Sequence, residues 1–580
     1  MKSSQVLKRI FKYTGKYSAM LILGLIFSAG GVAMTLYSPI LIGEAVDMII
    51  GPDNVDFGGI GKIAIQLAVV IAAGTVFQWL STLCTNYVAF KTTRSMRVDI
   101  FRKLGTLPLK YSDTHSHGDI LSRIIADIEQ VSDGLLQGFA QFFSGIATII
   151  GTIAFMFSVN AKIALVVIVL TPLSLFVAYF IAKNCQKMFV KQNKIRGELT
   201  GLAEEMISAS KTVRAFSYED ISQERLEEVN SRLYDCGVKA QFFSAMTNPC
   251  TRFVNGVVFA AVAISGALTA LSGTISVGQI SSFLTYANQY TKPFNEITGV
   301  ITELQNAFSC AARVFAVLDE ESESDDSALP EITNCDGSVK IENLSFSYSP
   351  KKPLIENFNL TAKPGQKTAI VGPTGCGKTT FINLLMRFYE PQEGVIKVSG
   401  IPANSVKRSS LRSCYGMVLQ ETWLFSGTVK ENIAYARPDA TDEEIINAAK
   451  LAHAHGFIKH LKDGYDTMIT EDGGNLSQGQ KQLLCIARIM LTSPPMLILD
   501  EATSSIDTRT EIKIQQAFDE MMKGRTSFIV AHRLSTIKTA DTILVMRDGK
   551  IIEQGTHESL MAENGFYANL YNSQFEPSEE

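Results

Sequence analysis

Charged residues are scarce in this sequence. Asp, Glu, Lys and Arg make up 19% of the 580 residues, whereas roughly a quarter of an ordinary soluble domain is charged. The shortage is concentrated in the first three hundred residues, where long uncharged runs occur, while the remainder has the composition of a soluble α/β protein. Because a chain of this length exceeds one compact core, we expect at least two domains of different character.

The cysteines and the net charge exclude several classes of function. The nine cysteines include no CxxC pair and no Cys/His cluster, which argues against a zinc site or a disulfide scaffold and favours reduced thiols. The formal net charge of −4 indicates no nucleic-acid partner. We expect no cleavable signal peptide. Residues 1–17 are basic and amphipathic, which predicts a helix along the inner membrane surface with Lys8, Arg9, Lys12 and Lys16 towards lipid headgroups.

Long apolar runs dominate the first half of the chain. A helix needs about 20 apolar residues to cross a bilayer, and in lipid its backbone polar groups must be satisfied internally. The run from residue 253 to 291 is too long for one span and contains a turn signal at 271–274. We therefore predict six transmembrane helices, at about 18–43, 63–90, 134–158, 161–182, 253–271 and 275–297.

The distribution of lysine and arginine predicts the orientation of these spans. Residues 44–61 and 271–274 contain neither residue type, whereas residues 91–133 contain seven and residues 183–252 contain eleven. Because basic connections stay in the cytoplasm, both termini are expected there. Each basic connection has a polar break, at 111–114 and at 217–220. We expect long cytoplasmic helical extensions with a short docking helix at each break; a plain solvated loop is the alternative.

The second half of the chain begins after an acidic, proline-containing segment. Residues 319–336 have the composition of a flexible linker, and residues 339–346 alternate as a half-buried strand. We predict a membrane domain at 1–318, a linker at 319–336 and a soluble domain at 337–580. The fold class is therefore an α-helical membrane domain followed by a cytoplasmic α/β domain.

A phosphate-binding motif follows the apolar strand 368–371. Its glycines allow backbone N–H groups to approach phosphate, Lys378 neutralises β- and γ-phosphate charge, and the Thr379 hydroxyl can ligate Mg²⁺. The following helix N-terminus adds a favourable field for an anion. The field also favours a thiolate at Cys376, so we expect a thiol reagent to block hydrolysis and ATP to protect. The motif consists of Gly372, Pro373, Thr374, Gly375, Cys376, Gly377, Lys378, Thr379 and Thr380.

Two carboxylates follow a second apolar strand, Met496–Leu499. Ligands bind at the carboxyl ends of strands in doubly wound sheets. Asp500 is expected to hold Mg²⁺, directly or through water, and Glu501 to orient or deprotonate the attacking water. An acidic pair after a strand is weak evidence by itself. Together with the preceding phosphate-binding motif, it predicts a nucleotide hydrolase.

The order of these motifs resembles the ATP-binding cassette (ABC) family, and the whole chain resembles a half-size exporter of the multidrug type. The resemblance rests on the P-loop, Gln420, the segment Leu476-Ser477-Gln478-Gly479-Gln480, Asp500-Glu501 and His532. It implies ATP and Mg²⁺ as cofactors and a second half-transporter as partner, because the family's signature segment binds ATP held by the opposite subunit.

The resemblance also implies individual roles. Tyr348 matches the aromatic that stacks on adenine, and Gln420 the residue that senses Mg²⁺ and the attacking water. Ser477 and Gly479 match the signature contacts to the partner's γ-phosphate. Asp507 matches the loop between the two sites, and His532 the γ-phosphate switch histidine.

One signature position departs from the family pattern. The usual residue there is glycine, whereas this chain has Gln478. The chain keeps Glu501 and His532, so its own hydrolytic site is expected to be competent. The signature segment that it supplies to the partner's ATP site is atypical. This combination favours the active member of a heterodimer over a homodimer, although Gln478 is also compatible with a harmless variant.

The resemblance implies transport by alternating access, driven by ATP, in a lipid bilayer. No charged residue lies deep within the predicted spans, which favours a hydrophobic or amphipathic substrate over an ion. A drug exporter and a lipid or lipopeptide flippase remain open alternatives, as does an ATP-gated channel or sensor that does not pump. We expect a bacterial plasma membrane location.

Overall fold

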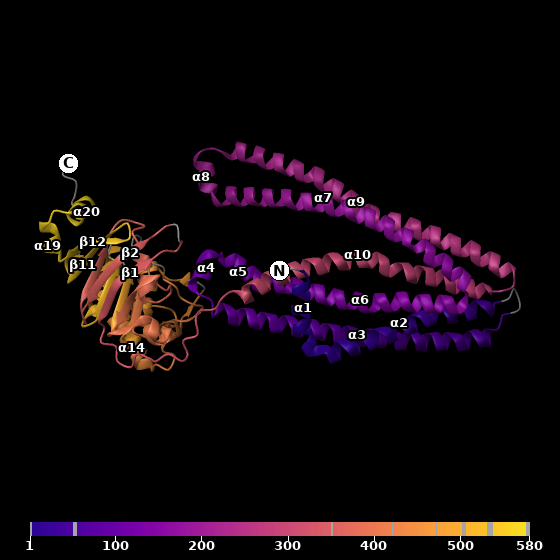
Figure 1. Cartoon of the computed structure of the whole chain (residues 1–580), viewed down its shortest axis with the longest axis horizontal. Coiled ribbons are helices and arrows are strands. Elements are labelled where there is room, and N and C mark those ends of the chain that lie inside the picture. The colour runs from indigo at the N-terminus through magenta and orange to yellow at the C-terminus, as the bar shows by residue number, and fades with distance from the viewer. Residues whose placement is uncertain are drawn as a thin grey trace. The chain divides into compact units, whose positions relative to one another are not determined.

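The computed structural model describes residues 3–49, 55–349, 352–419, 422–470, 473–500, 506–530 and 537–575. The chain forms two compact units. The membrane unit comprises the chain to Leu107 and His115–Glu321, and the cassette unit comprises Pro108–Thr114 and the chain from Ser322 onward. Each unit can be followed separately in Figure 1.

The membrane unit is built of helices. Each predicted span falls on a long helix of its own, although the last begins two residues before α10, because these sequences combine apolar side chains with strong helix formers. The helices are α1 (Ser3–Thr14), α2 (Ser18–Asp47), α3 (Phe57–Leu104), α5 (His117–Ile124), α6 (Ala126–Val159), α7 (Ala161–Ser208), α8 (Ser210–Ala215), α9 (Glu219–Leu271) and α10 (Val277–Asp319).

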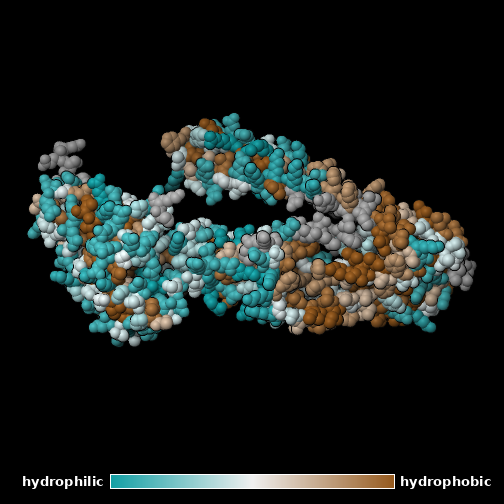
Figure 2. All heavy atoms as spheres, in the orientation of Figure 1, coloured by the Kyte–Doolittle hydropathy of each residue, from teal (hydrophilic) through white to brown (hydrophobic). Residues whose placement is uncertain are grey.

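Four helical stretches among the described residues are long and apolar enough to cross a membrane. They are Ser4–Asp47, Phe57–Leu104, His117–Val159 and Arg252–Leu271. Figure 2 shows hydrophobic residues gathered over the part of this unit away from α8, with largely hydrophilic residues around α8 itself. The number six stays a prediction.

Close helix packing fixes α10 against α2. A Cβ at Gly278 would overlap the carbonyl oxygen of Gly43, so the two backbones touch where both residues lack a side chain. The buried Tyr286 hydroxyl donates to the Leu36 carbonyl at 2.7 Å. These contacts hold the two helices at a fixed register.

The N-terminal helix packs on the membrane unit itself. Val6 and Ile10 are buried, and Arg9 pairs with Asp319 at 2.6 Å while its guanidinium lies over the Phe315 ring. A carboxylate and an aromatic face at the end of α10 thus bind the Arg9 side chain, and the position of α1 along the membrane surface stays a prediction.

The cassette unit contains two main sheets. The first sheet is antiparallel and has the strand order β2-β1-β4-β5. The second has the strand order β12-β11-β3-β10-β9-β6, and only β12 is antiparallel in it. A two-stranded sheet pairs β7 with β8. The strands are β1 (Val339–Phe346), β2 (Ile355–Ala362), β3 (Lys367–Val371), β4 (Glu393–Val398), β5 (Ile401–Pro402), β6 (Tyr415–Val418), β7 (Gly427–Thr428), β8 (Met468–Ile469), β9 (Met496–Asp500), β10 (Thr526–Val530), β11 (Thr542–Arg547) and β12 (Lys550–Gly555).

Two hydrophobic clusters cover the faces of the six-stranded sheet. The central strands β9 and β10 are buried on both faces, as expected for parallel strands between layers. The helices are α11 (Lys378–Leu385), α12 (Arg408–Ser413), α13 (Val429–Ile433), α14 (Asp442–Leu451), α15 (His455–Ile458), α16 (Gln478–Thr492), α17 (Thr508–Met522), α19 (His557–Ala562) and α20 (Phe566–Phe575).

Part of the expected linker is bound to the cassette. Arg408 donates to the Ser324 carbonyl at 2.8 Å and pairs with Asp326. Lys407 pairs with Glu331 at 2.8 Å. The acidic side chains that suggested a solvated linker are thus held by basic side chains of α12 and its N-cap.

A short helix covers the first polar break predicted in the cytoplasmic connections, and another short helix precedes the second. The first contains α4 (Leu109–Thr114), which belongs to the cassette unit. The second follows α8 and contains Ser217 in the left-handed region, at φ 48°. The expected docking helix is therefore observed at the first break, while docking at the second stays a prediction.

Candidate ATP-binding site

Four neighbouring parallel strands deliver the predicted site residues to one sheet edge. Strands β3, β10, β9 and β6 lie side by side in this order. Their carboxyl ends lead into the P-loop, residues 531–536, Asp500 and residues 420–421, respectively. Gln420, Glu501 and His532 lie outside the described residues. The strands that precede them nevertheless end at the same edge, where ligands of doubly wound sheets bind.

Backbone conformation explains the glycines of the P-loop. Gly372 and Gly377 have φ values of 154° and 106°, which side chains rarely tolerate. A Cβ at Gly372 would also overlap the carbonyl oxygen of Met546. The loop passes directly into α11, whose N-terminal amides favour an anion. Phosphate can therefore approach the backbone.

The lysine of the loop is held by the loop's own carbonyl groups. Lys378 Nζ donates to the carbonyls of Gly372 at 2.7 Å and of Pro373 at 3.0 Å. This places a positive charge beside the anion-binding amides. Thr379 is exposed at the start of α11, whereas Thr380 is buried.

The remaining loop residues divide into an exposed turn and a buried thiol. Pro373, Thr374 and Gly375 are exposed. Cys376 is only 3% exposed and belongs to a hydrophobic core cluster. A thiol reagent must therefore enter this core before it can reach Cys376, and the predicted inactivation stays a prediction.

An aromatic cluster surrounds Tyr348. Its side chain is 45% exposed, and its ring packs edge-on against Phe346 and Tyr389, with ring centroids 4.9 Å and 5.0 Å away. Asn383 of α11 donates to its hydroxyl at 3.4 Å. An exposed ring held on two sides can stack on a planar base.

Tyr389 connects this aromatic cluster to α4. Its hydroxyl donates to the Asp113 carboxylate. Burial, and next the hydrogen bond to Asp113, raise the pKa of Tyr389 above its ordinary value, so the hydroxyl remains a donor at neutral pH. Tyr389 could not be predicted from the sequence, because an aromatic residue after a helix has no distinctive spacing.

The acidic strand end lies near the P-loop strand. Asp500 is the last residue of β9 and pairs in register with Val530 of β10, the strand between β9 and β3. Its carboxylate is half-buried. A carboxylate and the Thr379 hydroxyl are oxygen donors of the kind that Mg²⁺ prefers, so the donor set fits this ion.

The signature segment forms the N-terminus of α16. Ser477 and Gln480 cap the helix reciprocally: Ser477 Oγ accepts from the Gln480 amide at 3.3 Å, and Gln480 Oε1 accepts from the Ser477 amide at 2.9 Å. Leu476 anchors the segment in the core, whereas Ser477 and Gln478 are exposed. The exposed helix N-terminus can accept an anion from outside the subunit.

Two further contacts position this segment. Gln478 Nε2 donates to Thr422 Oγ1 at 3.1 Å. A Cβ at Gly479 would overlap the Thr510 methyl group on α17, so only glycine allows this approach. Asp507 caps α17 by accepting from the Thr510 amide at 2.9 Å, and this bond lowers the pKa of Asp507.

Comparison with known proteins agrees with this arrangement. The family model described as "ABC transporter transmembrane region" matches residues 21–294, and the one described as "ABC transporter" matches residues 355–504. A fatty acid ABC transporter ATP-binding/permease protein of Mycobacterium tuberculosis is 43% identical over 89% of this chain and 82% of its own.

Two further relatives are informative. An ATP-dependent lipid A-core flippase of Photorhabdus laumondii is 36% identical over 88% of each chain. A solved bacterial Atm1-family ABC exporter with ATP bound has a TM-score of 0.76 at 28% identity, covering 98% of this chain and 99% of that one. The chain is therefore an integral membrane protein of the ABC transporter family, an exporter that binds and hydrolyses ATP and acts as a dimer.

Proposed function

We propose that this chain is a half-transporter whose own P-loop site hydrolyses ATP to move an amphipathic molecule out of the cytoplasm or the inner leaflet. The main support is the common sheet edge reached by the strands before the P-loop, Asp500, residue 420 and residue 532. In this proposal Glu501 orients or deprotonates the attacking water. His532 contacts the γ-phosphate, and Tyr348 stacks on adenine.

Thr379, Gln420 and Asp500 are the proposed Mg²⁺ ligands. A bound Mg²⁺ ion would neutralise charge that develops on the phosphate oxygens. Lys378 and the P-loop amides hold the β- and γ-phosphates in place. The chain's own residues thus position the nucleotide, and Glu501 orients the attacking water or accepts its proton.

The signature segment is proposed to serve the ATP of the second subunit. Ser477 and Gly479 would contact that γ-phosphate, and Asp507 would communicate between the two sites. We propose a heterodimer, because Gln478 replaces the usual glycine while Glu501 and His532 are retained. The hydrogen bond from Gln478 to Thr422 supports the alternative homodimer, because it holds the long side chain on its own subunit.

The transport cycle proposed is alternating access. Two ATP molecules would clamp the cassettes together, and α4 would transmit this closure, since it packs within the cassette unit and lies in a connection between spans. The names of two relatives specify a fatty acid and a lipid A-core. They favour a lipid over a drug as the amphipathic substrate.

The proposed location is a bacterial plasma membrane with both termini in the cytoplasm. Lysine and arginine are concentrated in the connections that would face the cytoplasm. The domain limits proposed are 1–318 for the membrane domain, 319–336 for the linker and 337–580 for the cassette.

ATPase activity of this chain, purified alone in lipid nanodiscs beside Glu501→Gln, tests the proposal. Robust turnover that E501Q abolishes identifies a self-sufficient homodimer with Glu501 as the catalytic carboxylate. Folded protein that binds ATP without turnover indicates that a different second subunit is needed. Turnover that persists in E501Q would contradict the role of Glu501. ATP-dependent uptake into inverted vesicles against a gradient distinguishes a pump from a channel or sensor.

A further inference from the structure

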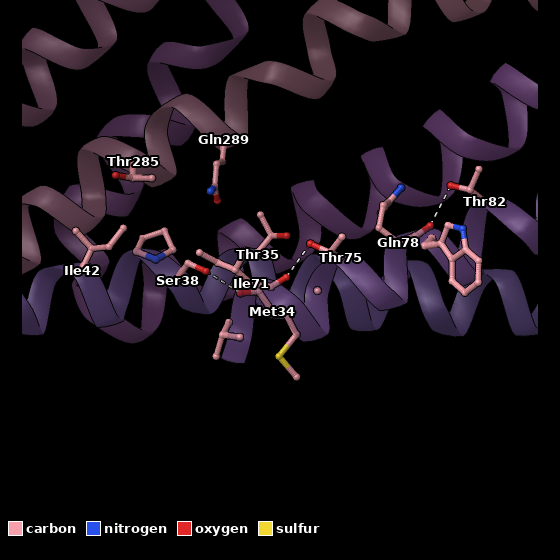
Figure 3. Close-up of a pocket in the computed structure, with 14 residues that line it drawn as sticks. Met34, Thr35, Ser38, Ile42, Ile71, Thr75, Gln78, Thr82, Thr285 and Gln289 are labelled. Carbon is pink, nitrogen blue, oxygen red and sulfur yellow. Dashed lines mark hydrogen bonds between the residues drawn. The ribbon is translucent and has the colours of Figure 1, made fainter. Parts of the chain in front are cut away.

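An open cavity of about 660 Å³ lies in the membrane unit, between α2, α3 and α10, and the lining residues Ile71 and Trp79 are more than half exposed. Its volume falls within the range of pockets that hold drug-sized ligands, roughly 300–1,000 Å³. Figure 3 shows side chains from the three helices converging on it. The fourteen lining residues are Met34, Thr35, Ser38, Pro39, Ile42, Val70, Ile71, Gly74, Thr75, Gln78, Trp79, Thr82, Thr285 and Gln289.

The hydroxyl protons of this cavity are already engaged in hydrogen bonds within the helices. Each hydroxyl group donates to a carbonyl group four residues earlier in its own helix, at 2.8–3.2 Å. A hydroxyl has one proton but two lone pairs, so these groups present only acceptors to a ligand. They belong to Thr35, Ser38, Thr75, Thr82 and Thr285.

The lining also carries N–H donors, on the side chains of Gln78, Trp79 and Gln289, but two further acceptors keep acceptor groups in the majority. Gln289 Oε1 is buried and has no hydrogen-bond partner among the described residues, and Figure 3 shows the Gln289 side chain directed into the cavity. Pro39 has no N–H group, so the Thr35 carbonyl lacks the donor that an ordinary helix would supply. A buried acceptor without a partner costs free energy that a ligand donor would recover.

The walls exclude a charged ligand. None of the described residues that line the cavity carries a formal charge, and an unpaired ion in an apolar site is strongly disfavoured. The ligand must therefore be uncharged, combine an apolar body with a polar head, and supply more donors than acceptors at that head.

We propose that this cavity binds a neutral lipid whose head carries free hydroxyl groups, such as a monoacylglycerol. The inference names a substrate class for the amphipathic export proposed above and rests on that function. The hydroxyl protons would go to Gln289 Oε1 and the acceptor-rich faces of α2 and α3, and the acyl chain would lie along Ile42, Ile71 and Met34.

Trp79 provides a direct measurement of binding. It lines the cavity and is one of only two tryptophans, the other being Trp423. In W423F, reconstituted in nanodiscs, a monoacylglycerol with a brominated chain should quench Trp79 saturably. Its di-O-methyl ether, which keeps the shape but lacks both donors, should bind about thirtyfold more weakly, since each of the two lost hydrogen bonds is worth roughly 1 kcal/mol.

Two variants complete the test. Gln289→Leu, made in W423F, should weaken monoacylglycerol binding about fivefold and leave ether binding unchanged. The matched control is Asn288→Leu, which removes a neighbouring exposed amide of α10 that does not line the cavity. It should bind like the W423F parent. The ether comparison needs no Gln289 substitution and therefore stands even if Q289L misfolds.

Equal dissociation constants for alcohol and ether, equally tight binding of the ionised brominated fatty acid, or quenching that rises linearly without saturation would overturn the proposal. ATPase and vesicle uptake in the same preparations separate the two claims. Glu501-dependent uptake of another amphipath without selective quenching refutes the cavity alone. Selective quenching without uptake refutes the export proposal and leaves the cavity standing.

Discussion

Replacing Tyr389 with phenylalanine removes a single hydroxyl from the contact between α4 and the cassette. The hydroxyl donates to Asp113, whereas the ring packs against Tyr348 and Phe346. The variant keeps the ring contacts. It therefore separates the attachment of α4 from the proposed stacking of adenine on Tyr348.

The size of the effect follows from the surroundings of the bond. A hydrogen bond to a charged group contributes about 1.5–3 kcal/mol, but Asp113 is exposed, so water compensates and about 1 kcal/mol remains. A loss of this size changes the equilibrium between attached and detached α4 about fivefold. Binding of ATP should be unaffected because Tyr348 keeps its neighbours.

Hydrogen exchange of the α4 amides measures this equilibrium directly. Residues 109–114 should exchange about fivefold faster in Y389F and in Asp113→Ala, and no faster when both are combined. Tyr435→Phe removes a hydroxyl elsewhere in the cassette unit and should leave α4 exchange unchanged. Effects of Y389F and D113A that simply multiply in the double variant would refute the pairwise bond. So would unaltered exchange in Y389F.

Three other predictions concern the rest of the chain. Gly479→Ala should lower ATPase activity about tenfold, because relieving the overlap with Thr510 costs roughly 1–3 kcal/mol. Adding Thr510→Ser, which removes the methyl group, should restore part of the activity. If activity is not restored, Gly479 acts directly on the phosphate. Arg313→Ala should destabilise the membrane unit by about 1–3 kcal/mol, because it leaves the buried Asp127 carboxylate unpaired. The loss stays in this range because Arg313 itself is half exposed. An unchanged melting temperature in nanodiscs would contradict this prediction. A hydrogen bond from the neighbouring Cys414 thiol lowers the pKa of Cys335 to about 6. The alkylation rate of Cys335, followed by mass spectrometry, should therefore rise with pH and reach half its maximum near pH 6. A half-maximum near pH 8.5, the ordinary thiol value, would show that the Cys335 pKa is not lowered.

The sequence predicted those parts of the fold that depend on local chemistry. Apolar runs predicted the long helices, and the order of strand, glycine-rich loop and helix predicted β3, the P-loop and α11. The attachment of α4 to the cassette was also expected at the first polar break. In each case the residues that determine the structure lie close together in the chain.

Contacts between distant residues were not predictable in this way. Arg9 pairs with Asp319, although the basic periodicity of residues 1–17 favoured a lipid-facing side chain. Tyr389 joins Asp113, and these residues belong to segments with unrelated patterns. The cavity of the membrane unit was equally hidden, because Thr35, Thr75 and Gln289 are unremarkable within their separate apolar runs.

The signature helix shows why one chain can be stable and yet incomplete. Ser477 Oγ accepts from the Gln480 amide, which satisfies a group that would otherwise be unpaired at the start of α16. That bond uses a lone pair and leaves the Ser477 proton free. The helix is therefore capped without any partner, while its exposed hydroxyl can still donate to a phosphate oxygen. Within the proposed dimer, ATP held by one subunit would supply the acceptor that the other subunit's Ser477 lacks, so nucleotide binding and association of the cassettes become the same event.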